Sequence, residues 1–244
     1  MDTLFVSDLH LSEERPDKID LFKRLLRGPA LEARALYILG DLFDHFWVGD
    51  DDRTPPNPEI CQELLAFSEK NKSLFIMRGN RDLMMRDNFS KVSGCSFLPD
   101  ETVIEVDGTR LLISHGDLYC TQDVSYQRYR RFINSGFTNF VFPRLPYAVR
   151  IRLAHGLRPA FKNASSKKDE AIIDVEQSAV EAAMTRHAVQ HLVHGHTHRS
   201  GMHEFELGGQ PATRTVLPDW YEDDGLLVCR GGERILMRVE EYLG

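Results

Sequence analysis

The sequence predicts an α/β protein in which short buried strands alternate with amphipathic helices and polar loops. Five apolar runs, rich in β-branched or large side chains, have the length and composition of buried strands. Each run is followed, directly or after one residue, by a short polar stretch, and helical patterns occupy several of the intervals between runs. With 244 residues and 42% hydrophobic content, the chain is long enough to bury a substantial core as one domain with an insertion.

A short polar stretch follows each predicted strand. The runs are Leu4 to Val6, Ala35 to Leu39, Leu74 to Met77, Leu111 to Ile113 and Leu192 to Val193. The stretches that follow them are Ser7-Asp8-Leu9-His10, Gly40-Asp41-Leu42-Phe43-Asp44, Gly79-Asn80-Arg81-Asp82, Ser114-His115-Gly116-Asp117 and Gly195-His196-Thr197-His198. Ligands of open sheets bind in the crevice beyond the strand ends, so we expect all five stretches to converge on one place.

The intervals between the strands predict the remaining elements. Apolar spacing and end signals predict helices over residues 17–27, 58–71, 81–91 and 169–189. The third of these would begin directly on the stretch that contains Asn80, so its N-terminal amides would face that site. A hairpin is expected over residues 102–114 with its turn at Asp107-Gly108. Residues 212–239 are expected to form strands that close a second sheet.

The five stretches supply oxygen and imidazole donors but no cysteine. The candidate metal ligands are Asp8, His10, Asp41, Asn80, His115, His196 and His198. Such donors suit manganese, iron, cobalt or zinc, and the absence of thiolate argues against a structural zinc site. Seven donors exceed the four of a tetrahedral site, so two ions that share one carboxylate are the natural count. A pair of ions ~3.5–4 Å apart can clamp the attacking and leaving oxygens of a phosphoryl transfer.

Taken together, these motifs resemble those of the calcineurin-like metallophosphoesterases, whose pattern runs D-x-H, G-D-x-x-D, G-N-H-[DE], a histidine-glycine segment and G-H-x-H. The chain departs from that pattern at Arg81, where most members have a histidine. With this variant and the segments that contain His115 and His196, the chain is similar over essentially its full length to the UDP-2,3-diacylglucosamine diphosphatase family of lipid A biosynthesis. The resemblance implies two packed mixed β-sheets flanked by helices, with an inserted helical lid at about residues 123–168.

The resemblance also implies a reaction and residue roles. The reaction is hydrolysis of the pyrophosphate of UDP-2,3-diacylglucosamine to UMP and 2,3-diacylglucosamine 1-phosphate, with manganese as the expected cofactor. One ion would be held by Asp8, His10, Asp41 and His198, and the other by Asp41, Asn80, His115 and His196. The substrate contacts would be Asn80, Arg81, Asp123, Tyr126, Arg158, Ser165, Lys168 and His196. The family usually has serine near 161 and asparagine near 165, where this chain has Phe161 and Ser165, so contacts in that loop stay open.

Arg81 suits the implied substrate on chemical grounds. A pyrophosphate leaves as a phosphate monoester, which is a stabilised anion, so neutralising its charge matters more than donating a proton. A guanidinium stays charged at neutral pH and can bind phosphate through two parallel donors. The alternative for Arg81 is an ion pair with a neighbouring acid such as Asp82.

Charge is segregated along the chain. Residues 128–168 carry seven arginines and three lysines without any acid, which leaves 20 basic against 37 acidic residues elsewhere, a net charge of −17. Eight of the 23 aromatic residues fall within residues 119–147. This interleaving predicts amphipathic helices that lie on a membrane surface or line an apolar pocket beneath a basic rim. The alternative is a helical subdomain with an aromatic core of its own.

The protein is expected in the cytoplasm, bound peripherally to the cytoplasmic face of the inner membrane. Its apolar runs are shorter than the ~20 residues of a membrane-spanning helix, and its four scattered cysteines fit reduced thiols. We expect no obligate protein partner, and no nucleic acid, because the acidic remainder would repel a polyanion. Three alternatives stay open: a phosphoesterase of soluble phosphodiesters or dinucleoside polyphosphates, a non-catalytic binding module, and a nuclease that binds through the basic segment.

Overall fold

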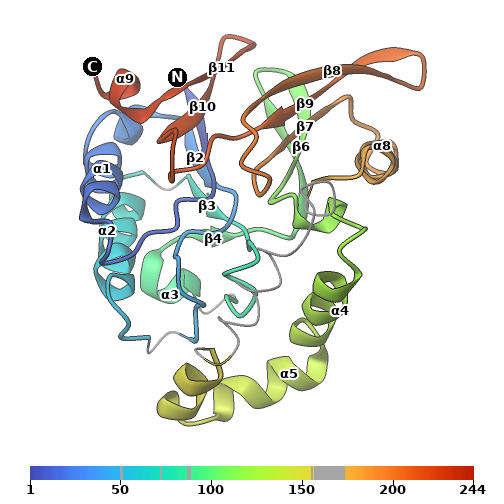
Figure 1. Cartoon of the computed structure of the whole chain (residues 1–244). Helices are drawn as coiled ribbons and strands as arrows, with labels where there is room; N and C mark the ends of the chain where they lie inside the picture. Colours follow the sequence, from blue (N-terminus) through green and yellow to red (C-terminus); the bar gives the residue numbers. More distant parts are fainter. Residues whose placement is uncertain (50–51, 72, 87–88, 155, 157–173) are drawn as a thin grey trace.

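Two mixed β-sheets packed face to face form the centre of the computed structural model (Figure 1). The structure describes residues 1–244 except 50–51, 72, 87–88, 155 and 157–173. Within that part of the chain, one sheet has the strand order β11-β10-β1-β2-β3-β4 and the other has the order β5-β6-β7-β9-β8. None of the helices that the structure describes is long and apolar enough to cross a membrane.

The first sheet has a parallel half and an antiparallel edge. Its strands are β1 (Thr3–Val6), β2 (Ala35–Ile38), β3 (Leu74–Ile76), β4 (Ser96–Phe97), β10 (Gly225–Arg230) and β11 (Glu233–Arg238). Strands β1 to β4 run parallel, whereas β10 pairs antiparallel with both β1 and β11. The helices beside this sheet are α1 (Pro16–Arg27), η1 (Pro29–Glu32), α2 (Asn57–Lys70), α3 (Phe89–Ser93) and α9 (Val239–Leu243).

The second sheet has three parallel strands between two antiparallel edges. Its strands are β5 (Glu101–Val106), β6 (Thr109–Ser114), β7 (His191–His194), β8 (Gly201–Leu207) and β9 (Gln210–Val216). Strands β6, β7 and β9 are parallel, and β5 and β8 pair antiparallel with β6 and β9. Helix α8 (Gln177–Arg186) packs on the outer face of this sheet.

Alternation along the strands builds a core on each side of the first sheet. On β1, Leu4 and Val6 pack with the helices, whereas Phe5 packs against Val193 and other residues of the second sheet. All four side chains are fully buried. Burial of apolar surface is the main favourable term in folding, and the two-residue period of a strand serves both layers at once. The order of layers is therefore helix, sheet, sheet, helix.

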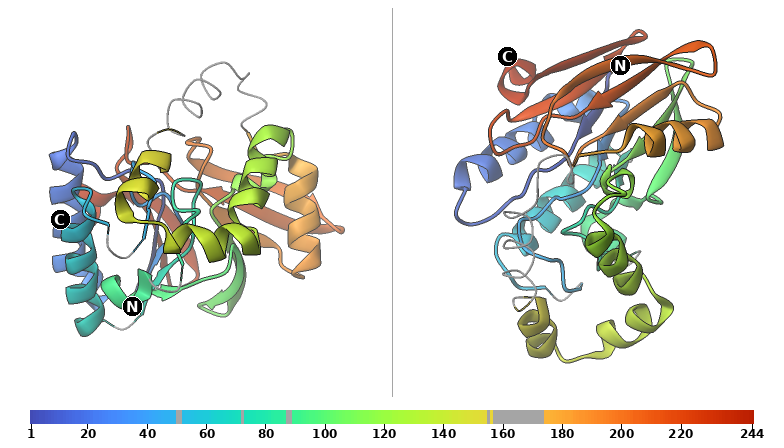
Figure 2. Two further views of the ribbon diagram at one scale, coloured as in Figure 1. Left: turned by 90° about the horizontal axis from the view of Figure 1, so that it is seen from below. Right: turned by 45° about the vertical axis from the view of Figure 1, so that its right-hand side comes forward.

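A helical arm lies between β6 and β7 of the second sheet in the chain. It contains α4 (Val124–Ile133), α5 (Gly136–Val141), η3 (Phe142–Arg144) and the helical residues 147–154. Figure 2 shows α4 and α5 projecting away from both sheets. At its far end the hydroxyl of Tyr147 accepts the N–H of Arg53 at 3.0 Å, and Arg150 donates to the carbonyl of Val48. The end of the predicted lid, from residue 157, lies outside the described residues.

The structure confirms the five predicted strands, the hairpin and the helices over 17–27 and 58–71 to within two residues. The helix predicted over 81–91 is wrong, because residues 81–86 form turns and α3 begins at Phe89. Tertiary hydrogen bonds form there instead of helical ones: the Asp82 carboxylate accepts the N–H of Leu42, and Nε of Arg86 donates to the side-chain oxygen of Asn139 at 3.1 Å. The segment 212–239 does not stay in the second sheet, because β10 and β11 join the first.

Candidate metal centre

The five polar loops meet where β1, β2, β3, β6 and β7 end. Backbone hydrogen bonds tie the loops to one another in pairs. The N–H of Asp8 donates to the carbonyl of Gly40 at 3.1 Å, and the N–H of His10 donates to that of Asp41 at 3.0 Å. In the second sheet the N–H of Gly195 donates to the carbonyl of His115 at 2.9 Å. The predicted convergence is therefore present in the fold.

The backbone of these loops adopts an uncommon conformation. In the described part of the chain, eight non-glycine residues have positive φ. Five of them are candidate ligands: Asp8, His10, Asp41, His196 and His198. Left-handed backbone at residues other than glycine costs on the order of 1 kcal/mol each, and it persists only where the surroundings enforce it. Such strain gathers at functional sites, and here it coincides with the donors.

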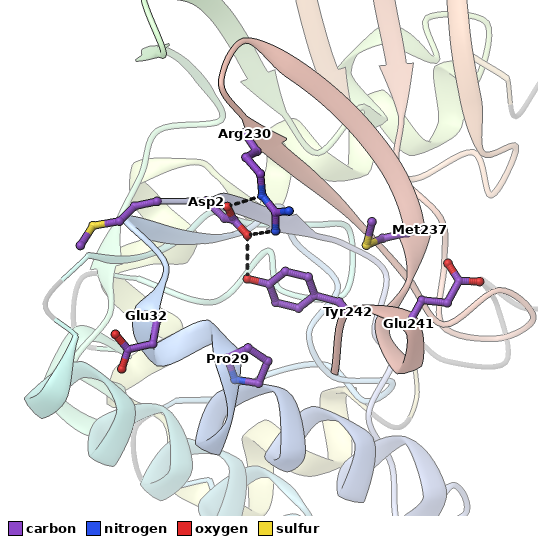
Figure 3. A pocket seen from close by; sticks show the side chains of 8 residues that line it. Asp2, Pro29, Glu32, Arg230, Met237, Glu241 and Tyr242 are labelled. Atoms are coloured by element: carbon purple, nitrogen blue, oxygen red, sulfur yellow. Dashed lines mark hydrogen bonds and ion pairs between the residues drawn. The ribbon is translucent and has the colours of Figure 1, made fainter. Parts of the chain in front are cut away.

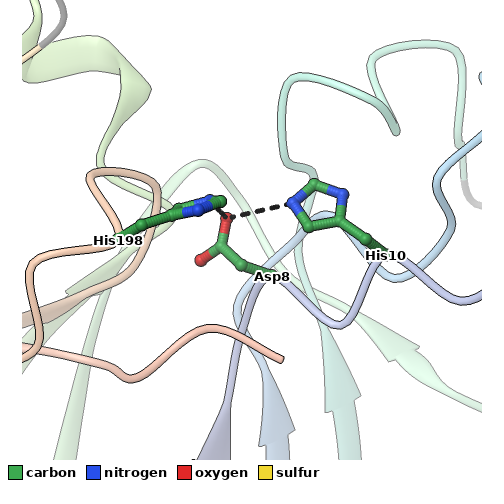
Figure 4. A group of neighbouring side chains, drawn as sticks. All are labelled: Asp8, His10 and His198. Atoms are coloured by element: carbon green, nitrogen blue, oxygen red, sulfur yellow. Dashed lines mark ion pairs between the residues drawn. The ribbon is translucent and has the colours of Figure 1, made fainter. Parts of the chain in front are cut away.

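One group of donors surrounds the carboxylate of Asp8 (Figure 4). The Oδ1 atom of Asp8 lies 3.9 Å from Nε2 of His10 and 3.5 Å from Nε2 of His198. The same nitrogen of His10 lies 3.7 Å from Oδ2 of Asp41. Metal–ligand bonds of ~2.1 Å place neighbouring ligand atoms ~3–3.5 Å apart, so these separations are close to those of ligands around one ion.

The two oxygens of Asp8 have different surroundings. Oδ2 accepts hydrogen bonds from the hydroxyl of Ser7 at 2.7 Å and from the N–H of His196 at 2.8 Å. Oδ1 is buried and has no hydrogen-bond partner among the residues that the structure describes. A buried acceptor without a partner costs free energy, and a bound cation would remove that cost. The donor set therefore fits a divalent ion at Oδ1.

A second group of donors surrounds the amide of Asn80. Its Oδ1 atom lies 3.1 Å from Nε2 of His115 and 2.9 Å from Nδ1 of His196, and Nε2 of His115 lies 3.8 Å from Oδ1 of Asp41. The other nitrogen of His115 is 2.8 Å from the carbonyl of Leu39, to which it donates. In the neutral ring this leaves the lone pair of Nε2 directed at the cluster, as a metal ligand requires.

The electrostatics of the cluster favour positive charge. Burial disfavours the imidazolium of His115, but the carboxylates of Asp41 and Asp8 outweigh burial and raise the pKa of His115 to about 9. Burial also opposes ionisation of Asp8, yet the nearby imidazoles, His198 first, hold the pKa of Asp8 well below its usual range. The carboxylates therefore favour a cation beside His115, whereas burial lowers the pKa of His10 and of His196 and keeps those rings neutral, as metal ligands must be.

Arg81 borders both groups of donors. Its backbone N–H donates to Oδ1 of Asp41 at 2.8 Å, while its guanidinium donates to the carbonyl of Asp44 at 3.4 Å and lies 6.0 Å from the ring of Phe46. Among the described residues it forms no ion pair with Asp82. Burial and the charge of Asp41 raise the pKa of Asp82 to about 7. The side chain of Arg81 is half-buried, so it is available at the rim of the site.

A segment without any recognised motif forms one wall of the cluster. Oδ2 of Asp219 lies 3.7 Å from Nδ1 of His198. The ring centroid of Tyr221 lies 4.7 Å from that of His10 and 5.9 Å from that of His198. The N–H of Trp220 donates to the carbonyl of Asp8 at 3.1 Å. Sequence reasoning missed these residues because they lie outside the five polar stretches, although the segment follows the end of β9 at Val216.

The substrate contacts implied by resemblance are only partly described. Asp123 is buried and caps α4, since its Oδ1 accepts the N–H of Tyr126 at 3.0 Å. The ring of Tyr126 lies 6.5 Å from that of His196, nearly parallel to it. Three predicted contacts and one departure from the family lie outside the described residues: Arg158, Ser165, Lys168 and Phe161.

A hollow elsewhere on the surface is unrelated to this cluster. It measures about 450 Å³ and lies beside Asp2, at the amino end of β1, whereas Asp8 follows the carboxyl end (Figure 3). The carboxylate of Asp2 is already bound by Arg230 at 2.6 and 2.8 Å and by the hydroxyl of Tyr242 at 3.2 Å. The chemistry therefore belongs to the loops at the other end of the strands.

Comparisons with known proteins agree with this geometry. Residues 1–200 match the family described as calcineurin-like phosphoesterase. A protein of Aeromonas hydrophila named UDP-2,3-diacylglucosamine hydrolase is 42% identical over 242 residues, which cover 99% of each chain. Proteins with the same name from Pseudomonas entomophila and Escherichia coli are 44% and 43% identical. They cover 89% and 93% of this chain and 90% and 94% of their own lengths.

Replacing Gly195 by alanine is expected to weaken divalent-ion binding by roughly tenfold or more. A Cβ atom at this position would overlap Oδ2 of Asp8 and the hydroxyl of Ser7, and it would push the carboxylate out of place. The measurement is a Mn²⁺ titration by calorimetry. Gly136→Ala is the matched control, because a Cβ atom there meets nothing within 4 Å. Equal Mn²⁺ affinities of Gly195→Ala and Gly136→Ala would contradict the assignment of Asp8 to the metal centre.

Proposed function

Because the chain belongs to the calcineurin-like phosphoesterase family, we propose that it hydrolyses the pyrophosphate bond of UDP-2,3-diacylglucosamine. The products would be UMP and 2,3-diacylglucosamine 1-phosphate. One observation carries the proposal: relatives named for action on this substrate match 89–99% of the chain at 42–44% identity. The two groups of donors support it, because they suit a hydrolysis assisted by two divalent ions.

We assign one divalent ion to each group of donors. The first would be held by Asp8, His10, Asp41 and His198, and the second by Asp41, Asn80, His115 and His196. The carboxylate of Asp41 would be shared, because its Oδ2 faces His10 and its Oδ1 faces His115. When bound, the ions would supply Lewis acidity and lower the pKa of a water molecule. We propose Mn²⁺, although iron, cobalt and zinc suit the same donors.

Arg81 would stabilise the departing phosphate. Its backbone is fixed by the hydrogen bond to Asp41, and its guanidinium lies at the rim beside the carbonyl of Asp44. A fixed positive charge near the leaving oxygen stabilises negative charge as it develops, and no proton transfer is needed for a phosphate monoester. The guanidinium would thus replace the histidine that most of the family has at this position.

The helical arm would receive the acylated part of the substrate. Ten large apolar side chains are exposed in the described part of the chain, and six of them lie between residues 124 and 153. Phe132, Phe137 and Phe140 are 60%, 71% and 62% exposed, which is far more than a self-contained aromatic core would leave. The exposed phenylalanines therefore favour a surface for acyl chains over the alternative of an independent helical subdomain.

The same arm would hold the protein at the cytoplasmic face of the inner membrane. Exposed phenylalanines at Phe137 and Phe140 lie on the same arm as exposed arginines such as Arg131 and Arg144. An apolar face rimmed by basic groups suits the interface of a bilayer with anionic lipids. Not every basic residue of the segment serves this purpose, because Arg130 and Arg150 are buried in hydrogen bonds within the protein.

Product analysis with diacylated UDP-glucosamine, Mn²⁺ and detergent tests the proposed reaction. Wild-type protein is expected to release UMP, and Asp41→Ala is expected to lose at least roughly a hundredfold in rate, because both groups of donors lose a ligand. Asp20→Ala, an exposed carboxylate on α1, is the control and should keep full activity. Faster cleavage of a soluble phosphodiester than of the lipid by wild-type protein would favour the alternative substrate class.

Arg81→Ala, which removes the guanidinium, is expected to lower kcat/KM by roughly 10²- to 10³-fold. Arg81→Lys should recover part of that loss, because it restores the charge without the two parallel donors. The comparison is made with Arg34→Ala, which removes an exposed guanidinium just before the amino end of β2. Equal kinetics of Arg81→Ala and Arg34→Ala would exclude a role for Arg81 in the reaction.

Membrane contact is tested with vesicles of phosphatidylethanolamine and phosphatidylglycerol. The double variant Phe137→Ser/Phe140→Ser should bind them at least roughly tenfold more weakly, since each buried aromatic ring contributes on the order of 2 kcal/mol. Met202→Ser removes a side chain that is 53% exposed on β8 and provides the control. Unchanged co-sedimentation of the double variant would argue against the arm as the membrane-binding surface.

A further inference from the structure

Asp117 belongs to the polar stretch that contains His115, yet it is not part of the metal cluster. Its side chain is 1% exposed. Oδ2 of Asp117 accepts a hydrogen bond from Nε of Arg130 at 2.7 Å and another from the hydroxyl of Tyr126. Both of those residues lie on α4, the first helix of the arm. The arm is therefore attached to a loop that also carries a candidate ligand.

Arg130, which binds Asp117, also binds a second aspartate. Nη2 of Arg130 donates to Oδ2 of Asp100 at 2.8 Å, and Oδ1 of Asp100 accepts from Nε and Nη2 of Arg78 at 3.1 and 2.8 Å. Arg78 also donates to the side chain of Asn134, which follows the end of α4. Two arginines and two aspartates thus alternate in one partly buried chain of hydrogen bonds.

The two ends of this series of hydrogen bonds, Arg78 and Asp117, are close in sequence to ligands of the second group of donors. Arg78 precedes Asn80 by two residues, and Asp117 follows His115 by two. Between them, Tyr126 on α4 places its ring 6.5 Å from that of His196. Among the described residues, Arg130 is the one that binds both Asp100 and Asp117, and it is 8% exposed. Its position therefore sets where α4 stands relative to Asn80, His115 and His196.

We infer that Arg130 is a positioning residue, which holds α4 against the loops of Asn80 and His115 and so fixes Tyr126 for binding of the acylated substrate. The inference rests on the proposed function for its kinetic part. Arginine suits this place because its rigid fork can bind two carboxylates at once. A residue that provides fewer donors would release one aspartate and let α4 move away from the site.

Arg130→Gln tests the inference, with Arg128→Gln as a matched control on the exposed side of the same helix. In Arg130→Gln the KM for diacylated UDP-glucosamine should rise by roughly tenfold, whereas kcat should change by less than about threefold. Mn²⁺ affinity, measured by calorimetry, should match that of wild type and show that the metal cluster is intact. An unchanged KM would overturn the inference, and so would a tenfold loss of Mn²⁺ affinity.

A second measurement separates this inference from the proposed reaction. Hydrogen exchange of the α4 amides should be faster in Arg130→Gln than in Arg128→Gln, whatever the substrate of the protein is. If wild-type protein failed to cleave the lipid, the proposed function would fail, and faster exchange would still support the anchoring of α4. Exchange as slow as that of Arg128→Gln would overturn it.

Tyr126→Phe removes the hydroxyl bound to Asp117 and allows a double-mutant cycle with Arg130→Gln. The increases in KM caused by Arg130→Gln and Tyr126→Phe should be less than multiplicative when combined, because both changes release the same anchor. Fully multiplicative effects would show that the two side chains act separately and would contradict a shared positioning role.

Discussion

The carboxylate of Asp41 lies between candidate ligands from both sheets, and both groups of donors include it. One of its oxygens faces His10, which follows a strand of the first sheet, and the other faces His115, which follows a strand of the second. The carboxylate of Asp41 lies directly against the backbone of Gly79, and this close contact requires glycine because a Cβ atom there would overlap the carboxylate. The packing of the two sheets thus holds each group together, since each group contains donors from both sheets and a shift of one sheet relative to the other would pull those donors apart.

The donors themselves were predictable from the sequence because the signal was local. Each candidate ligand follows a short apolar run, and parallel strands bring such ends to one edge. The seven donors predicted in this way all lie in the two groups described here. The backbone strain at Asp8, His10 and Asp41 was not predictable, because it follows from contacts between loops that are far apart in the chain.

Other features needed the tertiary structure. Residues 81–86 have a helical apolar pattern, but buried Asp82 satisfies the Leu42 backbone instead, so the turn conformation is preferred. The wall formed by Asp219 and Tyr221 has no counterpart in any short motif. The basic segment predicted amphipathic helices at a membrane surface or beneath a basic rim, yet Arg130 is almost completely buried between two aspartates that lie outside the segment. Composition indicates the sign of a charge but not its partner.

The pairing of β1 with β10 has a consequence for synthesis of the protein. The first strand of the chain lies beside one of the last, and the backbone of Trp220 is hydrogen-bonded to that of Asp8. His196 and His198, one in each group of donors, also come from the final quarter of the chain. A nascent polypeptide on the ribosome therefore contains Asp8 and Asp41 long before it contains the histidines that complete the two groups of donors. Under the ion assignment proposed above, neither group could hold its ion before these residues have left the exit tunnel, so metal loading would be a late event of maturation.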